Sequence, residues 1–164
     1  KLMSGSGMRF ARELDEPRAS LNEYGRLQLI RGAILNDWAR YGVHLVDAVL
    51  GLTPARPVDV TPLPARHESV AVRLDDGCLL QLDALGAVGR CFNVALYGTE
   101  RISSHDITDN FTMFRRLLYR FGRSLTAGEP GIPVADTLAS IRLLIAGERA
   151  MREERTVSVD EVKL

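Results

Sequence analysis

The chain has 164 residues, of which 46% are hydrophobic and 26% are charged, and 21 basic residues balance 21 acidic ones. This length suits one domain with its own core, and the composition is that of a soluble globular protein. Zero net charge gives no attraction to nucleic acid or an anionic membrane, and no apolar run approaches the roughly 18–20 residues that span a bilayer. We therefore expect a cytoplasmic protein with one domain over residues 5–159 and tails at 1–4 and 160–164.

The reactive residue types exclude several kinds of site. The two cysteines, Cys78 and Cys91, favour free buried thiols over a disulfide framework. The lysines stand at the ends of the chain, as Lys1 and Lys163, so Schiff-base chemistry is not expected in the body of the domain. The three histidines lack metal-ligand spacing, and we expect no metal site.

The first part of the chain mixes helical and extended patterns. In order, it predicts helical segments over 5–14 and 16–24, a strand over 26–32, a helix over 37–50 and an irregular or edge strand in the proline-rich stretch 53–64. Gly25 is expected to end the second helical segment, and Gly51 to end the 37–50 helix in a left-handed conformation. Asn36 or Asp37 is expected to cap that helix.

From residue 67 to 104 the hydrophobic period is two, which indicates antiparallel strands. Two later helices, over 109–124 and 134–152, carry apolar stripes that can cover one face of the sheet. The stripes are Phe111, Phe114, Leu118, Phe121 and Leu125 in the first helix, and Leu138, Ile141, Leu144 and Ile145 in the second. With a closing strand at 156–159, the pattern predicts an α+β fold, a mostly antiparallel open sheet with helices packed on one face.

The 37–50 helix carries the candidate site. At 3.6 residues per turn, Asp37, Arg40, His44 and Asp47 fall on one stripe. Two acids, a guanidinium and an imidazole on one stripe can hold a small polar ligand and move a proton. We predict that this stripe faces a cleft with His44 and Arg40 on one wall, because burying these groups without partners is costly.

Three motifs follow one another along most of the chain. They are Gly42-x-His44-x-x-Asp47 on the first long helix, Leu96-Tyr97-Gly98-Thr99-Glu100 before the late helices, and a closing run from Phe114-x-x-Leu117-Leu118-x-x-Phe121 through Ala127-Gly128-Glu129-Pro130 to Val157-Ser158-Val159. Their order and spacing resemble the C-terminal domain of the glucose–fructose oxidoreductase / inositol dehydrogenase (Gfo/Idh/MocA) family.

The resemblance implies one half of an NAD(P)-dependent oxidoreductase that acts on a sugar, polyol or related small polar substrate. It implies that His44 is the catalytic proton donor and acceptor, and that Asp37, Arg40, Tyr41 and Asp47 contact the substrate or orient that histidine. In the family an N-terminal Rossmann domain holds the cofactor, and the second domain also makes subunit contacts through its open sheet. We expect a homodimer, because an uncovered apolar face or edge is usually buried in a partner.

The cofactor is not expected to bind this chain by itself. No G-x-G-x-x-G follows a strand, and Gly5-Ser6-Gly7 has no strand before it, so it is expected to be a linker-like start. We therefore expect an isolated chain that is catalytically incomplete.

Alternatives remain open for this helix. Many family members carry an aspartate four residues before the histidine, where this chain has Arg40, which cannot accept a proton and better suits a carboxylate- or phosphate-bearing ligand. His44 can instead be satisfied by Asp47 or a backbone carbonyl, and the chain can be a non-catalytic self-associating or ligand-binding module of the same fold. Surface positions are expected for the other histidines and for a basic stripe, namely His67, His105, Arg116, Arg120 and Arg123.

Overall fold

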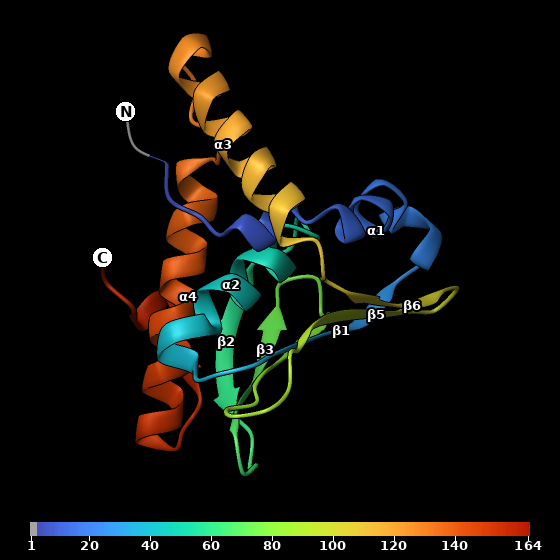
Figure 1. The fold of residues 1–164 in the computed structure, drawn as a ribbon. Helices are drawn as coiled ribbons and strands as arrows, with labels where there is room; N and C mark the ends of the chain where they lie inside the picture. The colour runs from blue at the N-terminus through green and yellow to red at the C-terminus, as the bar shows by residue number, and fades with distance from the viewer. Residues whose placement is uncertain (1–2) are drawn as a thin grey trace.

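The computed structural model describes residues 3–164 (Figure 1). Its strands are β1 (Leu27–Ile34), β2 (Pro57–Pro62), β3 (Glu68–Leu74), β4 (Leu79–Ala84), β5 (Phe92–Gly98), β6 (Ile102–Asp106) and β7 (Val157–Ser158). Its α-helices are α1 (Asp15–Ala19), α2 (Trp38–Leu50), α3 (Asn110–Ala127) and α4 (Val134–Glu153). Short 3-10 helices are η1 (Gly7–Phe10), η2 (Arg12–Leu14), η3 (Leu21–Tyr24) and η4 (Val159–Glu161).

The described strands form one seven-stranded sheet in the order β6-β5-β1-β4-β3-β2-β7. The β1–β4 pair is parallel, and the other five pairs are antiparallel. The parallel pair arises because the chain crosses over from β1 through α2 and the β2–β3 hairpin before it returns as β4. The predicted α+β fold, a mostly antiparallel sheet with helices on one face, is confirmed.

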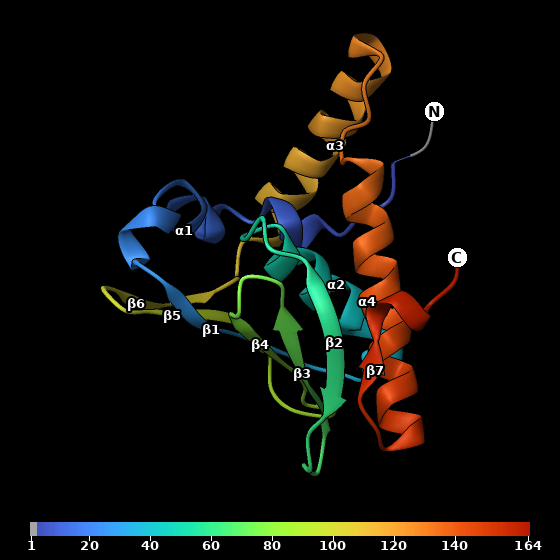
Figure 2. The same cartoon turned by 180° about the vertical axis from the view of Figure 1, so that it is seen from behind.

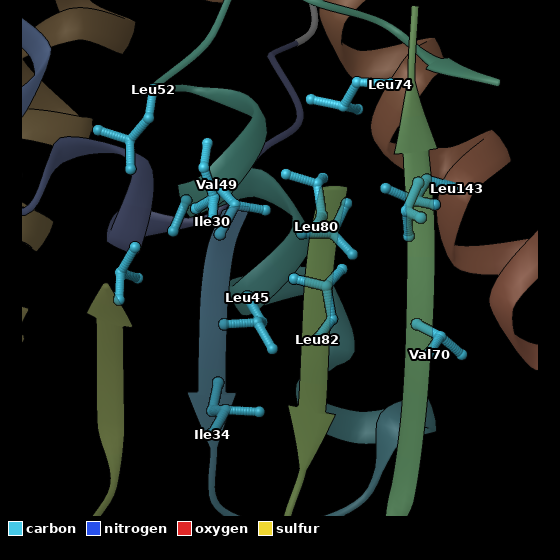
Figure 3. Close-up of a cluster of buried hydrophobic side chains, with 14 of the residues drawn as sticks. Ile30, Ile34, Leu45, Val49, Leu52, Val70, Leu74, Leu80, Leu82 and Leu143 are labelled. Atoms are coloured by element: carbon cyan, nitrogen blue, oxygen red, sulfur yellow. The ribbon is translucent and has the colours of Figure 1, made fainter. Parts of the chain in front are cut away.

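The core lies between the sheet and helices α2 and α4 (Figure 3). Leu45 from α2 lies between Ile30 of β1 and Leu82 of β4, whereas Leu143 from α4 lies over β3 near Val70, and all five side chains are fully buried. The absence of a side chain at Gly32 lets α2 lie close to β1, because a Cβ there would stand 2.5 Å from Leu45 Cδ1. Each such leucine contributes roughly 1.5–3 kcal/mol by leaving water, which makes this layer the main stabilising contact.

The α3 helix does not cover the sheet, so the prediction that its apolar stripe would be buried there is wrong. Figures 1 and 2 show α3 extending away from the body of the molecule, and it packs chiefly on η1. Phe111 is 77% exposed and Leu118 is 67% exposed. The reason is that the N-terminal segment, which also packs on α2, occupies the layer into which α3 would have to move.

The α4 helix does cover the sheet, but of the predicted stripe Leu144 packs against the core, and the buried face is made of other residues. Its inner face is made of Ser140, Leu143, Ala146, Gly147 and Ala150, whereas Ile145 is 40% exposed. Small side chains bring the helix close to its neighbours, and a Cβ at Gly147 would stand 2.5 Å from Trp38 Cζ2.

Several local predictions are confirmed and others are wrong. Asp37 caps α2, and Gly25 ends η3 with a φ of +66°. Residues 5–24 form mostly 3-10 turns instead of two helices. Gly51 is not left-handed, with a φ of −75°, and a Cβ there would stand 3.1 Å from Arg9 Cγ, so close packing favours glycine.

The remaining predictions concern β2 and the thiols. β2 pairs on both sides, with β3 and β7, so it is not an edge strand, but it is irregular at its start, where its register with β3 shifts between Pro57 and Asp59. Cys78 is buried and Cys91 half-buried, and both are free. Burial raises the pKa of the Cys78 thiol to about 11. Among residues 3–164, no helix has the length and apolar character needed to cross a membrane.

Candidate functional site

The first turn of α2 is fixed at three points. The Asp37 carboxylate accepts a hydrogen bond from the backbone N–H of Arg40 at 2.9 Å, and Glu68 Oε2 accepts one from the N–H of Trp38 at 2.6 Å. Both satisfy donors that a helix start leaves free. Trp38 Nε1 also donates to the carbonyl oxygen of Leu144 at 3.1 Å. The helix that carries the candidate residues is therefore held to both β3 and α4.

His44 is half-buried beside the N-terminal segment. Its Nδ1 lies 2.9 Å from Ser6 Oγ, and its ring meets Tyr41 edge-on at 5.4 Å between centroids. Burial lowers the pKa of His44 below its ordinary value, and the nearby charge of Asp47 opposes this effect only in part. The imidazole is therefore neutral near pH 7, the form that accepts a proton.

His44 and Tyr41 line a cavity of about 280 Å³ between α2, the N-terminal segment and the base of α3. The other walls are mostly apolar, with Phe92, Met113 and Phe114, and Asn110 adds an amide. The cavity is thus apolar with a few polar groups, which is typical of sites for small ligands.

Asp47 is 2% exposed, so it does not lie on the exposed stripe that the sequence predicted. Its Oδ1 accepts from Arg9 Nη1 at 3.0 Å and from Ser140 Oγ at 3.2 Å, and its Oδ2 accepts from the N–H of Ser6 at 2.6 Å. The carboxylate is therefore buried with partners, and it holds Ser6, the hydrogen-bond partner of His44, in place.

Arg40 and Asp37 lie outside the cavity, so the predicted wall shared by His44 and Arg40 is not found. The Arg40 side chain is 77% exposed and lies 3.5 Å from the Asp37 carboxylate, which is 43% exposed. An exposed pair of this kind contributes little to stability. Tyr41 stands on the cavity side instead, stacked on Phe92 with 6.2 Å between ring centroids.

The role of the N-terminal segment was not predicted from the sequence. Ser6 was expected in a linker-like start, but it is 4% exposed and contacts both His44 and Asp47. A possible signal was the glycine before it, because a Cβ at Gly5 would stand 3.1 Å from Asp47 Oδ2. The glycine at this position therefore reflects close packing against Asp47 of α2 and against Ile132.

The other histidines are partly exposed, in agreement with the expected surface positions, and each has a polar neighbour. His67 Nε2 lies 3.2 Å from Asp83 Oδ1, and His105 Nε2 lies 2.7 Å from Ser103 Oγ. In the part of the chain that the structure describes, no three His, Cys, Asp or Glu side chains are grouped so that they could hold a metal ion.

The turn from β1 into α2 does not fit a dinucleotide. It reads Leu35-Asn36-Asp37, without glycine, and the Asp37 carboxylate occupies the helix N-terminus. A pyrophosphate needs free N–H groups and close backbone approach at such a turn. Any nicotinamide cofactor therefore requires residues outside this turn.

Comparison with known proteins gives a match in structure only. No family model and no curated protein matches the sequence. A probable dehydrogenase from Thermotoga maritima is similar with a TM-score of 0.82 and 15% identity, over 99% of this chain and 66% of that one. A putative myo-inositol dehydrogenase from Sinorhizobium meliloti gives 0.81 and 15%, over 97% and 65%.

A further similar structure is scyllo-inositol dehydrogenase from Lactobacillus casei with bound NAD(H) and scyllo-inositol, with a TM-score of 0.76 and 15% identity, over 94% of this chain and 64% of that one. This chain spans about two thirds of the length of these dehydrogenases. The likeness confirms the fold that the resemblance to the Gfo/Idh/MocA C-terminal domain predicted, since the fold of this chain matches about two thirds of each of these three proteins.

Proposed function

We propose that this chain is the substrate-side and subunit-contact domain of a cytoplasmic NAD(P)-dependent oxidoreductase for a sugar, polyol or related small polar substrate. The observation that carries the proposal is a neutral His44 at the wall of a cavity, on a fold shared with inositol dehydrogenases. The cofactor is held by a separate domain, since the turn into α2 does not fit it. When bound there, NAD(P) supplies hydride transfer to or from the substrate carbon.

In this proposal His44 moves the proton of the substrate hydroxyl. Its Nδ1 contacts Ser6 Oγ, while Nε2 has no hydrogen-bond partner among the described residues and is left for the substrate. The serine hydroxyl can either donate to Nδ1 or accept from it, so both tautomers of the imidazole keep this contact. His44 can therefore take a proton during alcohol oxidation and return one during carbonyl reduction.

The other predicted residues differ in how directly they would contact the substrate. Tyr41 forms part of the substrate wall, and Asp47 acts through Ser6 as a positioning residue. Asp37 and Arg40 lie outside the cavity, so they would contact the substrate only through a group that extends beyond it. A guanidinium there favours a carboxylate or phosphate on that group.

The test uses the full natural protein that contains this chain. His44→Gln is expected to lower kcat by about 10²–10⁴-fold, the usual contribution of a general acid–base group, with the Kd of NAD(H) unchanged. Arg40→Gln is the matched control on the same helix, with an effect confined to KM. An unchanged kcat in His44→Gln would contradict the proposal that His44 is the general acid–base group.

Cofactor binding to the isolated chain is a second test, because we propose that a separate domain holds the cofactor. We expect no binding of NAD(H) tighter than about 1 mM by calorimetry, because the helix start is already occupied by Asp37. Micromolar binding would contradict the proposal of a separate cofactor domain.

We also propose a homodimer that forms through the uncovered face of the sheet. Strand pairing brings four apolar residues into one row across β6, β5, β1 and β4, namely Ile102, Tyr97, Leu29 and Leu79. Ile102 is 66% exposed and Leu79 is 41% exposed. An apolar row of this length on an open face favours a two-fold partner.

Light scattering at about 100 µM tests the dimer, since association depends on protein concentration. Ile102→Lys is expected to give a monomer, whereas Leu118→Lys on α3 is expected to leave the dimer intact. A wild-type chain that is monomeric at this concentration would contradict the proposal.

A non-catalytic module of the same fold is the second candidate. It is favoured by the position of Arg40 and by a cavity wall that carries no carboxylate among its described residues. The kcat of His44→Gln separates the two candidates, because a ligand-binding module has no turnover to lose.

A further inference from the structure

A second cavity, of about 470 Å³, lies on another face of α3 and shares no lining residue with the His44 cavity. Four guanidinium groups from three elements line it, namely Arg9 of η1, Arg18 of α1, and Arg116 and Arg120 of α3. Its described lining residues include no carboxylate. The sequence had indicated only a solvated stripe here, and the structure joins two members of that stripe with two distant arginines.

The carboxylates around this cavity do not neutralise its arginines. Three carboxylates are shared among four guanidinium groups, in the pairs Arg18–Asp15, Arg116–Asp15, Arg9–Asp47, Arg9–Asp136 and Arg56–Asp136. Burial lowers the pKa of Arg18, the Asp15 carboxylate opposes this effect in part, and the charges of Arg9 and Arg116 lower the pKa further. The cavity therefore carries an excess of positive charge that an anion can offset.

Arg116 and Arg120 keep hydrogen-bond donors for a ligand. A guanidinium has five N–H donors in a planar fork. Arg120 donates through Nε to the carbonyl of Gly131 at 2.8 Å, and it has no carboxylate partner among the described residues. Arg116 uses Nη1 on Asp15 and on the carbonyl of Phe10. The remaining N–H groups suit the bidentate binding of a phosphoryl group.

The cavity also has apolar lining residues. They are Phe10, Tyr119, Ile132 and Pro133, and Tyr119 is 68% exposed. Inorganic phosphate alone would leave these residues without contacts, and the volume lies in the range of sites for small organic ligands.

We propose that this cavity binds a small organic phosphate, with its phosphoryl group on Arg116 and Arg120 and its carbon part against Phe10 and Tyr119. The site goes beyond the oxidoreductase function and does not depend on it, because the two cavities have no lining residue in common.

Nuclear magnetic resonance titration of this chain at low salt tests the site with four probes. Phenyl phosphate is expected to give saturable shifts of the Arg116 and Arg120 Nε–H signals, with a Kd of about 1 mM or lower, and inorganic phosphate is expected to bind at least about fivefold more weakly. Benzyl alcohol, the neutral probe, is expected not to bind. Benzoate that binds as tightly as phenyl phosphate would overturn the assignment to phosphates.

Variants locate the binding. Arg120→Gln is expected to weaken phenyl phosphate binding about tenfold or more, because it removes a charged donor pair. Arg123→Gln removes the same charge from the same helix outside this cavity, and an effect below about twofold is expected. Equal losses in the two variants would indicate general charge attraction and would contradict a built site.

Tyr119→Ala keeps the test valid if Arg120→Gln fails to fold, since Tyr119 is largely exposed. It is expected to weaken phenyl phosphate binding about threefold or more while leaving inorganic phosphate binding unchanged. Unchanged phenyl phosphate binding in Tyr119→Ala, with circular dichroism that matches wild type, would overturn the proposed apolar subsite.

Discussion

Helices α3 and α4 are neighbours in the chain and were both expected to cover the sheet, yet one stands off it and the other forms its outer layer. The stripe of α3 has the larger side chains, and most of their surface is exposed. In α4, Leu143, Ala146 and Ala150 have no exposed surface. A strong apolar pattern therefore predicts that a helix face makes contacts, but it does not predict which part of the molecule makes them.

The difference follows from side-chain size and from competition for space. Small residues let the α4 axis approach Trp38 and the sheet, which allows dense packing. The large residues of α3 cannot enter a layer that the N-terminal segment already fills. Instead α3 provides walls for two cavities, through Phe114 on one face and Tyr119 on another.

The largest contrast between the helices is expected for leucine removal. Leu143→Ala should lower the free energy of unfolding by about 2–5 kcal/mol, because it creates a cavity in the core. Leu118→Ala should change it by less than about 0.5 kcal/mol, because its side chain is 67% exposed. Urea unfolding of both variants measures the difference, and equal losses would contradict the exposed position of α3.

Glycine replacement should give a smaller contrast with opposite signs. A Cβ at Gly147 meets the buried Trp38 ring, so Gly147→Ala should destabilise the fold by overpacking that is worth about 1–3 kcal/mol, of which higher helix propensity offsets up to about 1 kcal/mol. At Gly122 a Cβ meets nothing within 4 Å, so Gly122→Ala should stabilise the fold by up to about 1 kcal/mol. Thermal unfolding reports both signs, and a loss of stability in Gly122→Ala would place α3 against a surface.

The smallest expected effects concern the titration of His44, which α3 helps to shield. Phe114→Ala should raise the pKa of His44 toward its ordinary value of 6.5, because it opens the cavity to water. Leu144→Ala on α4 should leave this pKa unchanged, because Leu144 does not line the cavity. Titration of the His44 ring protons measures both pKa values. An equal shift in the two variants would contradict the proposal that α3 shields His44 from water.

The same shift has a consequence for stability. A pKa that is lowered in the folded state means that the unfolded chain binds more protons below pH 6.5. The contribution of His44 is therefore present above that pH and is lost as the pH falls toward the lowered value. His44→Gln should show a shallower loss of stability than wild type between about pH 7 and 5, and parallel curves would contradict the lowered pKa.

Some of the site was predictable and some was not. The hydrogen-bonded start of α2 follows from Asp37, three residues before the N–H that it caps, and His44 follows from the order of three motifs. The burial of Asp47 was not predictable, because its partner Arg9 is 38 residues earlier. Nothing in the periodicity of α2 indicates that a distant arginine will satisfy that carboxylate.

The sequence by itself determined the hydrophobic periods of the helices and strands. The α+β class, the strand faces and the helix starts follow from these local patterns, because they depend on residues a few positions apart. Only the tertiary structure decided which faces meet. It placed Ser6 on His44, turned Arg40 to solvent and left the α3 stripe exposed, since each outcome depends on chain segments that compete for the same space. Long-range contacts of this kind cannot be predicted from the sequence of a single helix or strand, because they form only when the whole core packs.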